Sequence, residues 1–308
     1  MKCYSAKHIN KQIRAESSSG GAFTALSDVI LSHAGKIIGW GYDYSSHIVE
    51  PKTCTTSEER DQLRGSKYIQ SDMKNIFRQI KADLELTAEP KTSIMFVGTP
   101  CQVSGLKSYL VATGTDMANI YLCDIVCHGV PSPGLWKRYI RNLLKGKHLE
   151  HVNFKDKRIS WKQPLAFAVV DGKEKSLRPY TLLYFGELIS RPSCEHCPYA
   201  SLERVSDITI GDHWSVQAMD PEFCSRDGVS LILVNTEKGQ KWFVDATDCI
   251  EYRERTTEQC LQPNLQRPTS PNAKRSLFWH MYHCNAVIAV IWFDFLIAAK
   301  KIFQRMIK

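Results

Sequence analysis

Two cysteines spaced two residues apart give the strongest chemical signal in the sequence. Cys194 and Cys197 belong to the run CEHCP (194–198), and a turn of this length directs both sulfur atoms to one side. A proline that follows such a pair is common in iron–sulfur binding runs. By itself the pair fits a redox dithiol, half of a zinc site or half of a cluster site. A metal centre therefore needs two further ligands from elsewhere in the chain.

Two other cysteines follow apolar segments that are typical of buried strands. Cys101 stands in GTPCQ after residues 93–98, and Cys127 stands in CHG at the end of residues 119–129. Ligands collect at the carboxyl ends of strands in α/β sheets, so we expect Cys101 and Cys127 to converge with Cys194 and Cys197. Four sulfur ligands indicate zinc or an iron–sulfur centre, and the spacing leaves both open.

The chain holds 11 cysteines, an odd number that is too small for a disulfide scaffold of 308 residues. The amino-terminal residues lack the apolar core of a signal peptide, so we expect a reducing cytoplasm in which clustered thiols bind metal or do redox chemistry. Five isolated cysteines are expected to be buried small apolar residues: Cys54, Cys224, Cys249, Cys260 and Cys284.

Two serine- and glycine-rich turns could bind phosphate. Residues 17–21 read SSSGG before an apolar helical segment, and residues 65–67 read GSK. Backbone N–H groups and hydroxyls at a helix N-terminus attract anions, although each turn alone also fits an ordinary helix cap. In GDHW, Asp212 and His213 are of the type that transfers protons, and His213 is the candidate catalytic residue. The alternative is that Asp212 bonds a turn and His213 is packed.

The elements that must position these residues alternate in type, which favours a mixed α/β fold with a layered sheet and flanking helices. The second half is richer in predicted strands, and a loop at 262–272 precedes a final helix. Strands are expected at 36–43, 93–98, 119–129, 151–157, 165–172, 176–186, 206–212 and 229–236. Helices are expected at 22–35, 57–65, 71–86, 103–112 and 131–147.

Composition sets outer limits on the function. Apolar residues make up 43% and charged residues 23%, as in an ordinary globular chain, which excludes global disorder and a multi-span membrane protein. The net charge of +8 is spread along the chain, so no nucleic-acid partner is expected. Residues 286–299 are apolar except for Asp294 and are too few to span a bilayer. Since basic residues follow, the helix either rests on a membrane surface or docks on protein.

Seven motifs in order resemble the beta-subunit family of coenzyme F420 hydrogenases and dehydrogenases, over roughly residues 3–270. They are SSSGGAFTAL (17–26), LRGSKYIQSD (63–72), MFVGTPCQVSGLK (95–107), CDIVCHGVPSPGLW (123–136), FKDKRISW (154–161), CEHCPYASLERVSDITIGDHW (194–214) and QPNL (262–265). The resemblance implies a flavoprotein with FAD and a [4Fe–4S] cluster, passing electrons between an iron–sulfur donor and a deazaflavin or a related conjugated substrate.

The resemblance also implies site residues. It assigns the cluster to Cys101, Cys127, Cys194 and Cys197, with Cys123 in reserve. It assigns flavin contacts to Ser18, Ser19, Gly20, Gly21, Ser66, Lys67, Gly98, Thr99, Pro100 and Gln102. Four aromatic residues are available to wall the ring: Tyr68, Trp136, Trp161 and Trp214.

Two departures from the family pattern bear on electron source and substrate. An amino-terminal ferredoxin-like module with closely spaced cysteines, which many family members carry, is not found here. The electrons are therefore expected to come from a separate ferredoxin-like or other carrier protein, or directly from a reduced cofactor, alongside a small-molecule redox substrate. At 211–215 the chain has GDHWS where the family pattern has GDFWG. His213 and Ser215 thus replace an aromatic residue and a glycine near the presumed substrate site, which bears on the identity of the substrate.

The expected organisation is one catalytic unit made of an N-terminal α/β region (1–92) and a cysteine-bearing region (93–270). A C-terminal helix (271–308) would dock on protein or rest on a membrane surface. Two other functions fit the cysteines. One is a zinc-stabilised, redox-inactive binding or scaffold protein. The other is a thiol enzyme with Cys101 as nucleophile, activated by His128 or His213.

Overall fold

The structure, a computed structural model, describes residues 1–86, 92–162 and 165–293. Its strands are β1 (Lys2–His8), β2 (Lys36–Asp43), β3 (Ile48–Cys54), β4 (Ile94–Gly98), β5 (Ile120–Ile125), β6 (Leu149–Asp156), β7 (Leu165–Val170), β8 (Lys173–Ser176), β9 (Ile208–Asp212), β10 (Ser230–Val234) and β11 (Ile250–Arg255). Its helices are α1 (Lys11–Glu16), α2 (Ala22–Ser32), α3 (Ser57–Asp61), α4 (Ile76–Leu84), α5 (Pro100–Ala112), α6 (Pro133–Leu144), α7 (Arg178–Phe185), α8 (Val216–Met219), α9 (Glu237–Asp245), α10 (Thr257–Cys260) and α11 (Arg275–Cys284). Short 3-10 turns are η1 (Pro192–His196), η2 (Thr247–Cys249) and η3 (Pro263–Leu265), and a further helix occupies 286–293.

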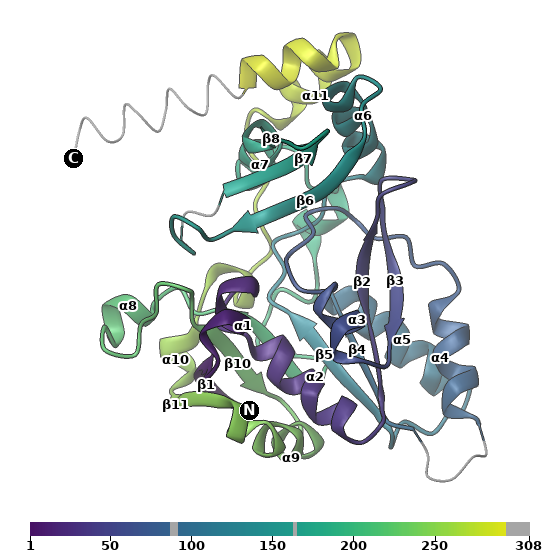
Figure 1. Cartoon of the computed structure of the whole chain (residues 1–308), viewed down its shortest axis with the longest axis vertical. Coiled ribbons are helices and arrows are strands. Elements are labelled where there is room, and N and C mark those ends of the chain that lie inside the picture. The colour runs from purple at the N-terminus through teal and green to yellow at the C-terminus, as the bar shows by residue number, and fades with distance from the viewer. Residues whose placement is uncertain (87–91, 163–164, 294–308) are drawn as a thin grey trace.

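An eight-stranded mixed sheet forms the lower part of the molecule in Figure 1, with strand order β11-β1-β10-β9-β5-β4-β2-β3. The strands β2, β4, β5 and β9 run parallel to one another, and the remaining pairs are antiparallel. Parallel pairing brings the carboxyl ends of β4 and β5 to one edge, which is where Cys101 and Cys127 follow. The predicted mixed α/β class is confirmed.

The two faces of this sheet are covered by different helices because successive strand residues point to opposite sides. Ile37 packs in a cluster with α2 and α9, whereas Ile38 packs with α4 and α5. Met95 and Phe96 divide in the same way between these two clusters. The middle of the sheet is therefore buried on both faces, which explains the continuous apolar runs in its sequence.

A three-stranded antiparallel sheet, β6-β7-β8, forms the upper part of the molecule together with α6, α7 and α11 (Figure 1). Its core is aromatic: Trp136 and Tyr180 are fully buried, with ring centroids 4.9 Å apart, and Phe278 joins them from α11. Trp136 therefore serves the core and does not wall a cofactor cavity.

Most predicted elements are present, and one was assigned the wrong type. Residues 176–186 were expected to be a strand but contain the helix α7, whose first turn holds Pro179 and whose buried face includes Tyr180, Leu183 and Tyr184. A proline in the first turn fits a helix because its missing N–H would have no partner there. The strands β1, β3, β8 and β11 and the helices α1, α8, α9 and α10 were not predicted.

The final helix was expected at 286–299. Residues 286–293 are helical, and 294–299 lie outside the described residues. Within the described ranges, no helix has the length and apolar content that crossing a bilayer requires.

Candidate functional site

The motif GTPCQ builds the N-terminus of α5. Thr99 is the N-cap, and its backbone N–H donates to Oε1 of Gln102 at 2.8 Å, as in a capping box. Pro100 occupies the first turn, and Cys101 follows it with an exposed thiol 3.1 Å from the Thr99 hydroxyl. The Gln102 amide also donates to the hydroxyl of Ser71 at 2.6 Å. Thr99 and Gln102 thus fix the position of Cys101.

Cys127 lies two residues beyond the end of β5, beside the loop that carries Cys194. The backbone N–H of Gly129 donates to the Cys127 sulfur at 3.4 Å. A side chain on Gly129, where φ is +97°, would stand 3.2 Å from Cβ of Cys194. The N–H of Arg191 donates to the carbonyl of Val130 at 3.0 Å, so the two loops run side by side.

Cys101 and Cys127 line one cavity, and Cys194 lies beside Gly129 on the neighbouring loop. Burial raises the pKa of the Cys127 thiol to about 12, and Cys101, Cys194 and Cys197 add to this shift. Burial also raises the pKa of Cys194, with contributions from Cys101 and Cys197. The reserve candidate, Cys123, is instead fully buried within β5 among apolar side chains.

The spacing of the four thiols bears on the kind of metal centre. In the part of the chain that the structure describes, no three His, Cys, Asp or Glu side chains come close enough to hold one metal ion. Cysteines that bind a four-iron cluster each bind a different iron atom, so their sulfur atoms are spaced more widely than the ligands of a single ion. Four thiols are a donor set that serves zinc as well as iron–sulfur centres, so the choice between the two stays a prediction.

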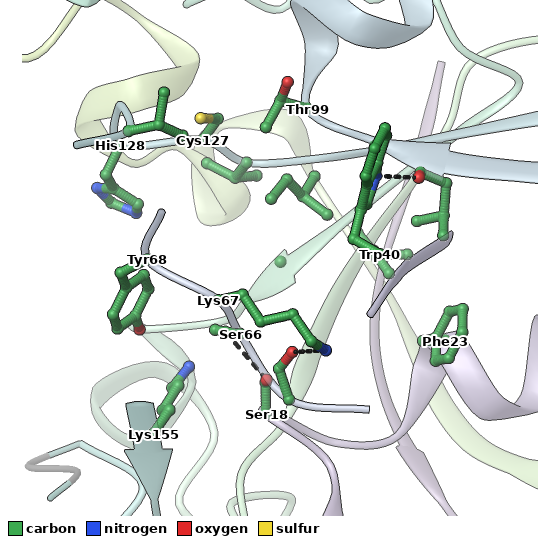
Figure 2. A pocket seen from close by; sticks show the side chains of 18 of the residues that line it. Ser18, Phe23, Trp40, Ser66, Lys67, Tyr68, Thr99, Cys127, His128 and Lys155 are labelled. Carbon is green, nitrogen blue, oxygen red and sulfur yellow. Dashed lines mark hydrogen bonds between the residues drawn. The ribbon is translucent and has the colours of Figure 1, made fainter. Parts of the chain in front are cut away.

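A cavity of about 370 Å³ lies at the carboxyl edge of the parallel strands, with mainly apolar walls. Cys101 and Cys127 line it, whereas Cys194 and Cys197 do not. It is also lined by eight of the ten residues proposed to bind the flavin: Ser18, Ser19, Gly21, Ser66, Lys67, Gly98, Thr99 and Gln102. Figure 2 shows Trp40 and Phe23 on one side of this cavity and Tyr68 and His128 on the other.

Gly20 and Pro100 do not line the cavity. Each instead shapes the backbone that carries neighbouring lining residues. A side chain at Gly20 would come within 2.5 Å of the Ala6 carbonyl and 2.6 Å of the Ser230 backbone nitrogen. Glycine therefore lets the loop 17–21 lie directly against β1 and β10. The next residue, Gly21, has φ of +95° and is the N-cap of α2.

The loops 17–19 and 63–67 meet at a hydrogen bond between the hydroxyls of Ser18 and Ser66, 3.0 Å apart (Figure 2). Beside it, Nζ of Lys67 donates to the carbonyls of Leu63 (2.8 Å) and Gly65 (3.1 Å). Burial lowers the pKa of Lys67 to about 8. A buried ammonium held by carbonyl groups leaves positive charge at this edge of the cavity, which suits an anion.

A second cavity of about 990 Å³ adjoins the first and shares the residues Ser18, Ser66, Lys67 and Lys155. Its lining is charged and includes Lys52, Lys157 and Arg226. Nζ of Lys157 donates to the carbonyls of Arg14, Ser19 and Asp227, and so ties β6 to the Ser/Gly loop. Two of the quoted motifs supply residues 63–67 and 154–158 to its lining, but the sequence did not indicate that they enclose a cavity.

Titratable side chains gather at the side of the first cavity near Cys127. Lys155 forms an ion pair with Oδ2 of Asp212, while Oδ1 of Asp212 is buried and has no hydrogen-bond partner among the described residues. Burial lowers the pKa of His128, and burial raises the pKa of Tyr68. Both side chains are therefore neutral near pH 7. The imidazole of His128 can exchange a proton with a bound group, whereas the phenol of Tyr68 can donate a hydrogen bond.

His213, the candidate catalytic residue, lines neither cavity. Its side chain is buried, Nδ1 lies 2.7 Å from the Ser5 hydroxyl, and Nε2 lies 3.2 Å from the carbonyl of Gln259. Burial lowers its pKa. The structure thus places His213 in a packed polar network between β1, β9 and α10, apart from the other site residues.

Only one of the four aromatic residues that were proposed to wall the ring lines the first cavity. Tyr68 lines the first cavity. Trp161 is buried and stacks on Trp214, with centroids 5.1 Å apart, and neither is among the described residues that line the first or the second cavity. Trp40 takes the place expected for these tryptophans and donates from Nε1 to the Val97 carbonyl at 2.8 Å. In the sequence, Trp40 stood inside a predicted strand with nothing to mark it.

The five isolated cysteines have unequal exposure. Cys54 and Cys260 are buried as expected, and Cys224 and Cys249 are half-buried. Cys284 is exposed, so the prediction was wrong there, because it ends α11 on the side away from the core.

Comparison with known proteins gives one family and one fold. Residues 91–259, more than half of the chain, match the family model that describes the C-terminal part of the beta subunit of coenzyme F420 hydrogenase/dehydrogenase. No curated protein matches the chain. Among 13 matching chains of solved structures is one from the F420-reducing [NiFe] hydrogenase complex of Methanosarcina barkeri, studied by xenon derivatization. It is 17% identical, with a TM-score of 0.55 over 82% of this chain and 81% of that chain, and so shows a shared fold.

Proposed function

This chain belongs to the family of coenzyme F420 hydrogenase/dehydrogenase beta subunits, and from that premise we propose that it is an oxidoreductase that uses FAD and a [4Fe–4S] cluster. It would pass electrons between an iron–sulfur donor and a deazaflavin or a related conjugated substrate. The observation that carries the proposal is the apolar cavity lined by Cys101 and Cys127, with Cys194 on the loop beside Gly129 and Cys197 three residues further along the chain.

The residues fit both groups by their chemistry. Four thiols form a soft donor set of the kind that binds iron–sulfur clusters, and burial of Cys127 and Cys194 disfavours their thiolates until a cation is bound. The cavity offers apolar walls for a ring system, and hydroxyls and a buried ammonium for phosphate. A bound flavin supplies two-electron chemistry on the substrate side and one-electron exchange with the cluster.

The side chains of this protein would take different roles according to their positions in the two cavities. Ser18, Ser66 and Lys67 would hold the phosphates where the two cavities meet. Trp40 and Tyr68 would confine the ring between them. His128 would exchange a proton at a ring nitrogen, and Lys155 would hold the Asp212 carboxylate in place.

The donor and the substrate would approach from different sides. Cys101 is exposed, so a cluster held by it would lie near the surface, within reach of a separate ferredoxin-like or other carrier protein. The larger, charged cavity would admit the small-molecule substrate. A cytoplasmic location is proposed with this function, because a reducing compartment keeps the four thiols free for iron.

Anaerobic purification followed by absorbance and metal analysis tests the proposal. We expect a yellow-brown protein with bound flavin and about four iron atoms and four sulfides per chain. Cys197→Ala should abolish cluster assembly, whereas Cys249→Ala, a matched change at an isolated half-buried thiol, should leave it intact. Colourless protein with neither flavin nor iron would refute the proposal. One zinc per chain without flavin would instead support the scaffold alternative.

A further inference from the structure

We propose that the end of the molecule formed by α6, α11 and the helix 286–293 docks on an anionic membrane surface. In Figure 1 these helices lie at the top of the molecule, on the far side of β6–β8 from the eight-stranded sheet. This inference concerns where the protein works and is independent of the proposed redox function.

The helix 286–293 exposes large apolar side chains along one face. Val287, Ile288, Ile291 and Trp292 are 49%, 57%, 63% and 50% exposed, and their spacing of one, three and one residues places them on adjacent turns of one face. Exposed apolar residues are normal singly, but a contiguous group on one helix marks an interaction site.

The opposite face of the same helix fixes its orientation. Ala289 and Phe293 are buried, and the Phe293 ring packs against Phe278 of α11 with centroids 5.2 Å apart. Asn285 caps the helix through hydrogen bonds from the N–H groups of Val287 and Ile288, both 3.1 Å long. The helix is therefore anchored to the protein core and presents its apolar face outward.

The elements at this end are rich in basic residues. Residues 131–147 and 271–293 together contain seven Lys and Arg residues and no Asp or Glu, and two of the seven, Lys147 and Arg275, pair with Asp171 and Glu195 of other segments. On α6, Arg138 and Arg141 are exposed, and the Arg138 guanidinium lies 5.2 Å from the centre of the Tyr282 ring, which places α6 beside α11. The sequence after the described residues adds Lys300, Lys301, Arg305 and Lys308.

A lipid surface accounts for this combination better than a protein partner. An amphipathic helix binds a bilayer through an apolar face with tryptophan at the boundary, supported by basic residues that attract anionic headgroups. A protein interface needs no excess of one charge sign across two helices. The helix would lie in the interface, since none of the described helices meets the length and apolar content for crossing a membrane.

Vesicle flotation with the full-length protein tests the inference. We expect the protein to float with vesicles made of equal parts phosphatidylcholine and phosphatidylglycerol, and to remain at the bottom with phosphatidylcholine alone. The double variant Ile288→Glu/Trp292→Glu should lose at least about tenfold in partitioning, because burial of two large side chains is replaced by two charges. Val111→Glu is the control, since Val111 is 62% exposed on α5, far from this end.

A second pair of variants tests the charge. Arg138→Gln and Arg141→Gln should each reduce binding about fivefold at low salt, and added salt should remove the difference. No flotation, or equal flotation with neutral vesicles, would overturn the inference. So would a wild-type protein that self-associates through this face without lipid while the glutamate variant stays monomeric in size-exclusion chromatography. Unchanged near-UV circular dichroism shows that each variant is folded.

Discussion

Replacing Arg204 by methionine isolates a buried charge in the segment that carries Cys194 and Cys197. Arg204 and Asp124 form an ion pair of 2.8 Å, and their side chains are 1% and 0% exposed. The same guanidinium donates to the carbonyls of Tyr199 (2.9 Å) and Ile125 (3.3 Å). Arg204 therefore links the segment after Cys197 to the end of β5, from which Cys127 follows.

The expected loss of stability is large. Removing one partner of a buried ion pair leaves the other charge without compensation, which costs about 3–5 kcal/mol. A typical domain has about 5–15 kcal/mol of stability in total, so the variant should remain folded with a clearly lower urea midpoint. Because the segment is no longer tied to β5, iron content after anaerobic reconstitution should fall as well.

The loss of stability in Arg204→Met should be larger at neutral pH than at mildly acidic pH. Burial raises the pKa of Asp124, and Arg204 opposes that shift. Without Arg204 the folded-state pKa rises further above the unfolded value, so the folded protein takes up a proton more readily than the unfolded chain. Stability lost at neutral pH is therefore regained as the pH falls through the folded-state pKa. The difference between variant and wild type should shrink in mildly acidic buffer.

Urea unfolding followed by tryptophan fluorescence, at neutral and at mildly acidic pH, measures both effects. Arg158→Met is the matched control, because Arg158 is 47% exposed and pairs at the surface with Asp156 and Glu174, and its midpoint should hardly change. The double variant Arg204→Met/Asp124→Leu should recover part of the loss. The reasoning is refuted if Arg204→Met costs less than about 1 kcal/mol, the range of exposed pairs, or if its deficit is the same at both pH values.

Three further predictions address the loop, the cavity edge and the packed histidine. Gly20→Ala should lower stability by about 1–3 kcal/mol in urea unfolding, because the new methyl meets backbone atoms of β1 and β10, whereas Gly134→Ala, with its nearest contact at 3.6 Å, should not. Lys67→Met should weaken FAD binding about tenfold in a fluorescence titration if its ammonium balances phosphate, with Lys52→Met, at the second cavity only, as control. Burial lowers the pKa of His213 in the folded protein. The free energy of unfolding should therefore fall as the pH drops below about 6.5, the pKa of histidine in the unfolded chain. His213→Gln should flatten this dependence of stability on pH by at most about 1.4 kcal/mol per pH unit. Equal effects of the two glycine variants would contradict the first prediction, and an unchanged FAD affinity of Lys67→Met would contradict the second. The third would be contradicted if stability depended on pH in His213→Gln as it does in the wild type.

Features that depend on neighbouring residues were predictable from the sequence. The apolar runs before Cys101 and Cys127 are strands, and GTPCQ is a helix N-terminus, because strand period, caps and turn residues act over a few positions. The helix α7 was missed because aromatic and apolar residues in 176–186 fit either element, and its proline was not read as a first-turn residue.

Features that join distant segments were not predictable in the same way. The strand β1 escaped notice because its buried side chains include the polar Ser5 and His8, and the partner of Ser5, His213, lies 208 positions away. Lys155 and Asp212 are 57 positions apart and belong to different motifs, and Trp40 lies outside all of the quoted motifs. Their spacing in the sequence does not show that they meet at one cavity.

By itself, the sequence determined the α/β class, the family and the thiols that could bind metal, since these follow from residue type, order and spacing. The tertiary structure decided which of those residues meet. Parallel pairing of β4 and β5 brings Cys101 and Cys127 to one edge, and the loop pairing at Val130 and Arg191 brings Cys194 to them. It also buried His213 away from the cavity. Contacts of this kind are set by the packing of whole elements, in which each residue's position depends on segments far along the chain.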